Sequence, residues 1–342
     1  MKAYRFVGFP DPPVLVDVPV PDPGPDQVLV RIGGAGACHS DLHLIDEEGA
    51  APWAVPFTLG HENAGTVAAL GAGVEGVDVG AAVAVYGAWG CGRCKRCRLG
   101  EETRCDAARA IGTLGGGLGR DGGMAEYLLV PSARHLVPIG DLDPVEAAPL
   151  TDAALTPYHA VRGALHVLAP DATAVVIGVG GLGHMAVQIL RAVTAAQIVA
   201  VDVSAEKRAH ALRLGADVAL PPEGAAERVR ELTGGVGADA VLDLVGAQAT
   251  VDLAASLPRA GVHVAVVGLG GGTLPVRLGG LPMDVTAVMP YWGARDELVE
   301  ALALAQAGRI RADVERFPLA QADEAYRRMR EGTLAGRAVL VP

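Results

Sequence analysis

Four of the five cysteines in this chain stand in one short stretch, which reads CGRCKRCRLGEETRC. They are Cys91, Cys94, Cys97 and Cys105. Their spacing, C-x2-C-x2-C-x7-C, gathers four thiolates on one glycine-containing segment, and four thiolates suit a tetrahedral zinc ion that keeps no open position. Positively charged neighbours would offset the negative charge of such a site; these are Arg93, Lys95, Arg96 and Arg98. The run therefore predicts a structural zinc site that does no chemistry.

Two other interpretations of the cysteine run are weaker. Disulfides between cysteines only three residues apart would strain the segment, and disulfides are rare in reducing compartments. An iron–sulfur cluster is worth weighing because bacterial ferredoxins also begin with C-x2-C-x2-C, but their fourth cysteine follows after three residues and precedes proline. Here the last gap is seven residues and Asp106 follows Cys105. Zinc is therefore the favoured ion.

The fifth cysteine, Cys38, stands in the motif GACHSDLH, and a second polar motif, LGHEN, holds His61 and Glu62. A single cysteine is more often a small buried residue than a ligand, but two such motifs beside a zinc pattern favour a second metal site. A catalytic zinc takes three protein ligands and keeps a fourth position open. Cys38 and His61 supply two. The spacing leaves the third open among several candidates: Glu62, Asp152, His159 and others.

A glycine-rich turn, GVGGLG, occupies residues 178–183. It follows the apolar run AVVI and precedes the helical run HMAVQILRAV, which is the context of a dinucleotide-binding G-x-G-x-x-G turn. Such glycines let the backbone approach a pyrophosphate at the N-terminus of the helix. Asp202 ends the next apolar run, where a carboxylate contacts ribose hydroxyls and repels a 2′-phosphate. Because Val203 supplies no positive charge there, the sequence favours NAD over NADP.

The elements that must hold these residues fall into two parts, as expected for a chain of 342 residues. The first ~150 residues indicate a β-rich domain, because short apolar runs are separated by Gly, Pro and Asp. These runs cover residues 28–32, 65–70, 81–86 and 125–130.

From Thr151 onward, apolar runs alternate with helical patterns, which is typical of a doubly wound parallel sheet in an α/β protein. The expected strands lie near residues 174–177, 197–202, 217–220, 238–246 and 261–271. The expected helices lie near residues 184–193, 204–216 and 249–261. After the segment 285–293 we expect one more helix, 294–308, and a short tail.

The overall composition excludes several classes of partner. The net charge is −11 and no dense basic run occurs, which argues against binding nucleic acid. We expect the small arginine group Arg327, Arg328 and Arg330 to lie on a solvated helix face. The N-terminus, MKAYRFVGFPDPP, lacks the features of a signal peptide, and no apolar run of about 20 residues predicts a membrane span. We therefore expect a cytoplasmic protein with no membrane partner.

Taken together, five motifs resemble the zinc-dependent medium-chain alcohol dehydrogenases in order and approximate spacing. They are GACHSDLH, LGHEN, the four-cysteine run, PLTDAALTPYHA and GVGGLGH. The resemblance spans essentially the whole chain. Two segments, LTDAALTPYHA and PYWG, look most like bacterial NAD-dependent enzymes that act on secondary alcohols and ketones.

The resemblance implies a GroES-like catalytic domain formed by residues 1–152 and 291–342, and a Rossmann domain formed by residues 153–290. NAD, two zinc ions per chain and an alcohol or ketone substrate would be bound, with NAD, the catalytic zinc and the substrate in a cleft between the domains. The strand before PYWG resembles the family's dimer contact. A homo-oligomer is therefore expected, with a tetramer favoured over a dimer.

By position, the resemblance implies that Cys38, His61 and Asp152 ligate the catalytic zinc, and that Glu62 is the nearby carboxylate that approaches zinc during ligand exchange. Many relatives have a cysteine where Asp152 stands. Asp41 would orient the ligand histidine, a role with a clear physical purpose. Ser40 matches the hydroxyl that contacts the substrate oxygen, and His43 the outer end of a proton relay.

The resemblance also implies contacts with the cofactor and the substrate. The implied cofactor contacts are His39, Thr156, Gly178, Gly180, Gly181, Leu182, Gly183, Asp202, Arg208, Val245, Val267 and Arg337. The implied substrate pocket is lined by Trp53, Leu118, Tyr291 and Trp292. Core packing could explain any of these aromatic residues.

Two other functions remain open at the level of the sequence. One is a zinc-dependent dehydrogenase of the same superfamily that acts on polyols or on formaldehyde adducts. The other is a zinc-stabilised protein that senses NAD(H) without turnover, which would need only the four-cysteine zinc. The zinc-free quinone reductases of the superfamily are disfavoured because they lack these cysteines.

Overall fold

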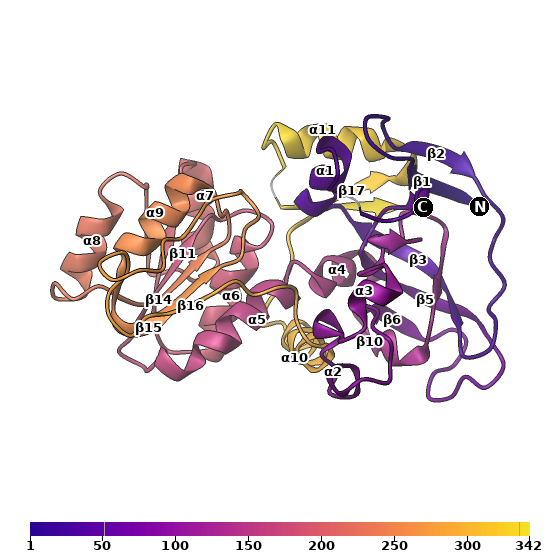
Figure 1. The fold of residues 1–342 in the computed structure, drawn as a ribbon, viewed down its shortest axis with the longest axis horizontal. Coiled ribbons are helices and arrows are strands. Elements are labelled where there is room, and N and C mark those ends of the chain that lie inside the picture. The colour runs from indigo at the N-terminus through magenta and orange to yellow at the C-terminus, as the bar shows by residue number, and fades with distance from the viewer. Residues whose placement is uncertain (51, 335) are drawn as a thin grey trace. The chain divides into compact units, whose positions relative to one another are not determined.

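The computed structural model describes residues 1–50, 52–334 and 336–342 of the chain (Figure 1). These residues form two compact units. The first comprises Met1–Asp152, Ala294–Gln306 and Ala312–Pro342, and the second comprises Ala153–Gly293 and Ala307–Arg311. The sequence placed all residues from 291 onward in the first domain. In the structure, residues 291–293 and 307–311 pack with the second unit instead. In the part of the chain that is described, no helix is long and apolar enough to cross a membrane.

The first unit is built on a largely antiparallel sheet. Within the described residues, its strands are β10 (Leu136–Pro138), β6 (Ala82–Val85), β5 (Glu62–Leu70), β3 (Val28–Gly36), β18 (Arg337–Val341) and β17 (Val314–Pro318) in spatial order, with β9 (Tyr127–Val130) also paired to β3. A smaller sheet has the order β2 (Val14–Asp17), β1 (Lys2–Phe6), β4 (Phe57–Thr58), and two short strands, β7 (Gly115–Gly116) and β8 (Gly119–Arg120), pair in parallel. Only β17 and β18 run parallel among the described strands of the larger sheet.

Short helices connect and cover these strands. They are α1 (His39–Asp46), α2 (Lys95–Arg98), α3 (Ala108–Ile111), α4 (Pro144–Ala147), α10 (Arg295–Gln306) and α11 (Ala322–Arg330), with 3-10 turns at Glu102–Arg104, Ala133–His135, Ala148–Thr151 and Leu319–Gln321. The helix α1 follows β3 in the chain. The helix α11 lies against α1 (yellow on indigo in Figure 1).

The helix α11 forms because apolar residues recur along one of its faces. Ala322, Ala325, Tyr326 and Met329 are buried, a spacing of three and four residues that matches the helical repeat. On the opposite face Arg327 pairs with Glu324 and Glu331 in solvent. The expectation that this arginine group lies on a solvated helix face is confirmed for Arg327.

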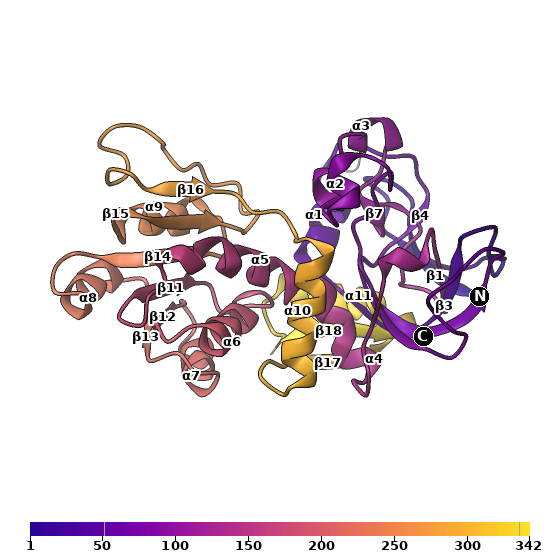
Figure 2. The same ribbon diagram turned by 90° about the horizontal axis from the view of Figure 1, so that it is seen from below.

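The second unit holds the predicted parallel sheet (Figure 2). In spatial order its described strands are β13 (Val218–Leu220), β12 (Gln197–Val201), β11 (Thr173–Ile177), β14 (Ala238–Asp243), β15 (Pro258–Val266) and β16 (Thr286–Val288). Its helices are α5 (Leu155–Ala164), α6 (Gly183–Val193), α7 (Ala205–Arg213), α8 (Ala225–Leu232) and α9 (Gln248–Ser256), with a 3-10 turn at Leu165–Val167. All neighbouring strands pair in parallel.

One helix prediction was wrong at its end. The pattern over residues 249–261 predicted helix throughout, but α9 stops at Ser256 and β15 starts at Pro258. Proline lacks the N–H that would continue a helix, and it is tolerated at the first position of a strand. The helix α8 was not predicted.

The first unit also buries a histidine with no evident partner. His135 follows β9 in a 3-10 turn and is 1% exposed. In the described residues neither of its ring nitrogens has a hydrogen-bond partner, and the ring lies 6.1 Å from that of Trp89. Burial, and then the charge of Arg134, lower the pKa of His135 to about 3. The fold therefore holds this ring neutral.

Because the unfolded chain takes up a proton on His135 near pH 6.5 and the folded chain does so only near 3, acid should destabilise the fold through this residue. We expect His135→Phe to gain about 2 kcal/mol of unfolding free energy relative to the natural protein when the pH falls from 7 to 5. Urea unfolding followed by tryptophan fluorescence would measure this. Parallel pH curves for the two proteins would contradict it.

Candidate functional site

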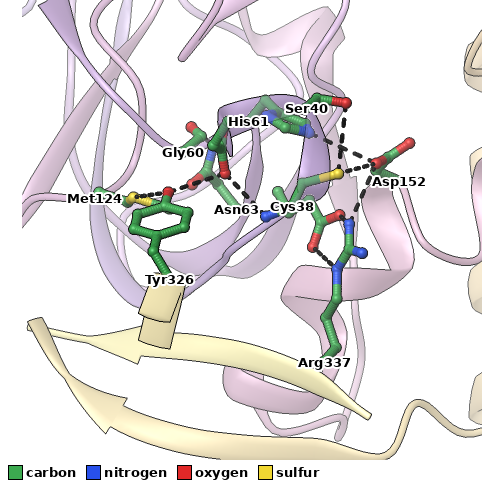
Figure 3. A network of polar contacts seen from close by, with 11 residues as sticks. Cys38, Ser40, Gly60, His61, Asn63, Met124, Asp152, Tyr326 and Arg337 are labelled. Atoms are coloured by element: carbon green, nitrogen blue, oxygen red, sulfur yellow. Dashed lines mark hydrogen bonds and ion pairs between the residues drawn. The ribbon is translucent and has the colours of Figure 1, made fainter. Parts of the chain in front are cut away.

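The first unit gathers the residues of the two polar motifs where three strands meet. Cys38 lies between β3 and α1, His61 and Glu62 lie at the start of β5, and Arg337 begins β18. Asp152 follows the 3-10 turn that packs on these strands. One donor atom from each of Cys38, His61, Glu62 and Asp152 lies within 4.8 Å of the others. Figure 3 shows Cys38, His61 and Asp152 pointing toward one another.

The spacing of these donors fits a tetrahedral metal ion. The Cys38 Sγ and Asp152 Oδ2 atoms are 3.6 Å apart, and the His61 Nε2 and Asp152 Oδ2 atoms are also 3.6 Å apart. Ligands at usual zinc bond lengths stand roughly 3.3–3.8 Å from each other in a tetrahedron. One sulfur, one imidazole nitrogen and one carboxylate oxygen can therefore share one ion.

The charge of the cluster also calls for a cation. Cys38, Asp41 and Glu62 are almost fully buried and Asp152 is 9% exposed. Arg337 contributes one positive charge against three carboxyl groups and a thiol, and burial raises the pKa of the Glu62 carboxyl to about 8 in spite of Arg337. Because a buried and uncompensated charge is very costly, a dication fits this site.

Arg337 binds Glu62 rather than solvent. Its guanidinium donates from Nε to Glu62 Oε2 at 3.0 Å and from its terminal nitrogen to Glu62 Oε1, and it lies 3.5 Å from Asp152 Oδ2. Burial alone would lower the pKa of Arg337, but Cys38, Glu62 and Asp152 raise it well above its usual value. The pairing holds the Glu62 carboxylate beside the other donors of the cluster. The predicted contact of Arg337 with a pyrophosphate stays a prediction.

The close approach of β3 to Glu62 requires a residue without a side chain. A Cβ atom on Gly36 would lie 1.9 Å from Glu62 Oε2. A glycine two residues before Cys38 therefore leaves the space that the Glu62 carboxylate fills.

His61 is oriented by a buried carboxylate. Its Nδ1 atom lies 3.1 Å from Asp41 Oδ1, which leaves Nε2 toward Asp152. Burial alone would lower the pKa of His61, but Asp41 and Asp152 raise it well above 6.5. A metal ion that binds Nε2 therefore has to displace a proton. The predicted role of Asp41 as the residue that orients His61 agrees with this contact.

Three other predicted residues lie on α1 around the cluster. Ser40 Oγ is 3.6 Å from Cys38 Sγ, so its hydroxyl borders the donor set (Figure 3). His43 is half-exposed and its Nδ1 atom pairs with Glu47 at 2.8 Å. His39 is exposed at the start of the helix. The structure places Ser40 at the metal site and His43 at the solvent side of the same helix.

The four-cysteine run forms a second donor cluster. Its thiols lie within 4.8 Å of one another and none forms a disulfide. Backbone N–H groups point at the sulfurs: that of Cys94 donates to Cys91 Sγ and that of Cys97 to Cys94 Sγ, each at 3.4 Å. The backbone N–H groups of Arg93 and Cys94 lower the pKa of Cys91 to about 6. These contacts favour the thiolate of Cys91, as zinc ligation requires, whereas burial raises the pKa of the Cys97 thiol to about 12.

In the second unit, the glycine turn joins β11 to α6. Gly178 has a φ of +86°, and a Cβ atom on Gly183 would lie 1.8 Å from the Gly178 carbonyl oxygen. Asp202, after β12, accepts hydrogen bonds from the N–H groups of Val179 and Ser204, each at 2.8 Å. The carboxylate therefore fastens the glycine turn to the end of the neighbouring strand.

Other predicted cofactor residues surround this turn or lie on neighbouring elements. Arg208 donates to the carbonyls of Asp202 and Val203. Val245 lies against Gly178, because a Cβ atom there would meet Val245 Cγ2 at 2.4 Å. The remaining residues of this group are Thr156 on α5, Gly180, Gly181 and Leu182 in the turn, and Val267 after β15.

The four residues predicted to line the substrate pocket belong to two different units. In the first, Trp53 packs on the ring of Phe57 with centroids 6.2 Å apart, and Leu118 is buried. In the second, Tyr291 is half-exposed and its ring makes an edge contact with that of Trp292. A pocket shared by these four residues stays a prediction.

Sequence reasoning missed Tyr326. Its hydroxyl donates to Asp41 Oδ2 at 3.0 Å, and it lies 3.3 Å from Met124 Sδ (Figure 3). The apolar spacing of α11 could have indicated that this tyrosine is buried. No motif links it to a residue 285 positions earlier.

Comparisons with known proteins agree with this geometry. Residues 24–141 match the family model described as "Alcohol dehydrogenase GroES-like domain", and residues 181–307 match "Zinc-binding dehydrogenase". An NAD-dependent alcohol dehydrogenase of Sulfurisphaera tokodaii is 38% identical, over 100% of both chains. The chain belongs to the zinc-dependent medium-chain alcohol dehydrogenase family.

Two further similar proteins extend the comparison. A D-arabinose 1-dehydrogenase (NADP(+)) of Saccharolobus solfataricus is 35% identical, over 100% of this chain and 97% of that protein. The structure of acetophenone reductase from Geotrichum candidum in complex with NAD aligns with a TM-score of 0.87 and 32% identity, over 100% of this chain and 97% of the other.

Membership in the alcohol dehydrogenase family confirms the expected fold class, a GroES-like domain with a Rossmann-type parallel-sheet domain. It also identifies the two donor clusters as a structural four-cysteine zinc site and a catalytic zinc site. The expectation that the chain stands closest to bacterial secondary-alcohol enzymes is not supported, because the two relatives above that match it over its full length are an archaeal NAD-dependent alcohol dehydrogenase and an archaeal D-arabinose 1-dehydrogenase (NADP(+)).

The glycine turn makes two substitutions distinguishable. We expect Gly183→Ala to cost about 1–3 kcal/mol of unfolding free energy, because its Cβ atom would overlap the Gly178 carbonyl oxygen. A Cβ atom on Gly180 would meet no atom within 4 Å. Gly180→Ala should therefore keep the melting temperature and weaken only dinucleotide binding, since that backbone approaches the pyrophosphate.

Thermal unfolding and NAD titration of the two variants would test this contrast. Equal melting temperatures for Gly183→Ala and Gly180→Ala would show that the close approach of Gly183 to Gly178 does not matter.

Proposed function

We propose that this chain is an NAD-dependent zinc alcohol dehydrogenase that interconverts secondary alcohols and ketones. The observation that carries the proposal is the convergence of Cys38, His61 and Asp152 on one point, with the hydroxyl of Ser40 beside the sulfur. The relationship to an acetophenone reductase supports a ketone as one substrate class. Primary alcohols and aldehydes would be further substrates of the same site.

The chemistry follows from these side chains. A bound zinc ion supplies a Lewis acid that polarises a carbonyl oxygen and lowers the pKa of an alcohol. Cys38, His61 and Asp152 would hold it, and Asp41 keeps the His61 Nε2 atom turned toward it. Ser40 would take up or return the proton of the substrate hydroxyl. His43, at the solvent side of α1, would exchange that proton with water.

Asp202 supports the choice of NAD. Its carboxylate ends β12 beside the glycine turn, where it would receive the ribose hydroxyls and repel a 2′-phosphate. Arg208 is turned toward the carbonyls of Asp202 and Val203 and so is engaged in the turn itself. Both features favour the unphosphorylated cofactor.

A second candidate function has one observation in its favour. A relative that matches the whole chain is a D-arabinose 1-dehydrogenase, so a polyol or sugar could be the substrate. Trp53 and Leu118, which the resemblance places at the substrate, are apolar and favour an apolar ketone instead. Formaldehyde adducts have no observation in their favour. A sensor without turnover does not explain why the second donor cluster is present.

We further propose that the chain forms a homodimer through β16, and a tetramer from two such dimers. The strand β16 is an edge strand of the parallel sheet (Figure 2). Among the described residues, it pairs with a strand on one side only. Exposed apolar side chains flank it, among them Met283 and Met289. A second copy would pair the open edge and cover these side chains.

The metal assignment predicts different results for two cysteines. Cys38→Ser should remove the catalytic zinc and lower turnover by more than about a hundredfold, because even loss of an outer partner of a zinc ligand costs about 10- to 100-fold. Cys94→Ser should remove the structural zinc and lower the melting temperature. The turnover number of the molecules that remain folded should be unchanged. Metal analysis should find about one zinc per chain in each variant and about two in the natural protein.

Turnover would be measured with a panel of secondary alcohols, aryl ketones, aldehydes and polyols, each with NAD(H) and NADP(H). Full activity of Cys38→Ser would rule out the catalytic role of this site. Highest activity on polyols would replace the ketone proposal by the second candidate.

The choice of cofactor predicts the effect of removing one carboxylate. Asp202→Gly should lower the NAD over NADP ratio of kcat/KM by about 10- to 100-fold, because the repulsion between this carboxylate and a 2′-phosphate is lost. It should also destabilise the second unit, since Val179 and Ser204 lose their acceptor.

Asp217→Gly is the matched control for the Asp202 variant. Asp217 likewise accepts a backbone N–H, that of Ile198, but before β13 rather than after β12. The Asp217→Gly variant should be less stable but keep the NAD over NADP ratio of kcat/KM. An unchanged ratio in Asp202→Gly would contradict the role of its charge.

A further inference from the structure

The buried carboxylate of Asp41 accepts hydrogen bonds from three parts of the chain. Asp41 Oδ1 lies 3.1 Å from His61 Nδ1, and Asp41 Oδ2 accepts from the backbone N–H of Cys38 at 2.9 Å. The third donor is the hydroxyl of Tyr326, also to Oδ2, at 3.0 Å. Asp41 is fully buried, so each of these bonds forms in a low-dielectric interior where loss of a donor is costly.

The Tyr326 hydroxyl has two acceptors in reach, Asp41 Oδ2 and Met124 Sδ. A carboxylate oxygen is a much better acceptor than a thioether sulfur, so the proton points to Asp41. Through this bond the hydroxyl limits rotation of the carboxylate about its own axis. The other oxygen is thereby kept within hydrogen-bond distance of His61 Nδ1.

The position of Tyr326 is itself well determined. Its ring stacks on that of Tyr4, with centroids 6.1 Å apart and an angle of 23° between the planes. The Tyr4 hydroxyl donates to Asp323 on the same helix. One turn further along α11, Arg330 binds Asp46 at the end of α1 through two nitrogens, at 2.9 and 2.7 Å. The helix α11 is thus fastened to α1 at two points.

We propose that Tyr326 is a positioning residue of the catalytic zinc site, which acts by fixing Asp41 and, through it, both His61 and the backbone at Cys38. One proton donor on the C-terminal helix thereby orients two of the zinc ligands. This inference rests on the zinc assignment made in the proposed function.

The test is Tyr326→Phe in the full chain, which removes one oxygen and keeps the ring. Zinc affinity of the catalytic site would be measured by competition with a chelator, and cobalt(II) would be substituted at that site for its visible spectrum. We expect zinc affinity to fall about three- to tenfold, less than the 10- to 100-fold cost of losing a direct partner of a ligand. The cobalt absorption bands should shift, because the imidazole is less firmly held.

Tyr4→Phe is the matched control, since Tyr4 is equally buried in the same ring stack and its hydroxyl reaches Asp323 instead of Asp41. It should show the zinc affinity and cobalt spectrum of the natural protein, whatever stability it loses. Natural affinity and spectrum in Tyr326→Phe, or equal changes in both variants, would overturn the proposal.

These readouts do not depend on turnover, so the inference and the proposed function can fail separately. If the natural protein binds two zinc ions and Tyr326→Phe is unchanged, only the role of Tyr326 fails. If the natural protein binds zinc at the cysteine run alone, both are overturned.

Discussion

The stability of the first unit depends on positive charge that balances its buried acidic groups, and Arg337 is the arginine that lies among them. Asp41 and Glu62 are fully buried, with Cys38 and Asp152 next to them. In a low-dielectric interior, unbalanced negative charge costs more than the hydrogen bonds around it return. Arg337 offsets part of this charge, and a dication would offset most of the rest. The zinc ion therefore belongs to the electrostatics of the fold as well as to its chemistry.

This constraint explains the topology around the site. The strand β18 pairs with β3, and β3 pairs with β5, so the end of β3 meets the starts of the other two strands. That junction brings Cys38, Glu62 and Arg337 together although they are far apart in the chain. Gly36 is needed there because a Cβ atom at this position would overlap the Glu62 carboxylate.

Whether a feature could be predicted from the sequence depends on how far apart along the chain its contacting residues lie. The glycine turn and the parallel strands were predictable because their signals lie within a few neighbouring residues. Asp152 could not be chosen by spacing, and the resemblance supplied it. Tyr326 was missed because its contact with Asp41 spans 285 residues. The segment expected to be a short tail contains α11 and two strands of the larger sheet.

The two zinc sites also differ in how far apart in the sequence their ligands and supporting contacts lie. The cysteine site is local: its four thiols come from one segment, and backbone N–H groups of that segment already point at the sulfurs. Such a segment can bind zinc before the rest of the unit is folded. The catalytic site exists only after β3, β5 and β18 have paired and α11 has docked on α1. Its zinc affinity is therefore linked to the folding of the whole unit, and residues distant from the metal, on the C-terminal helix, can change it.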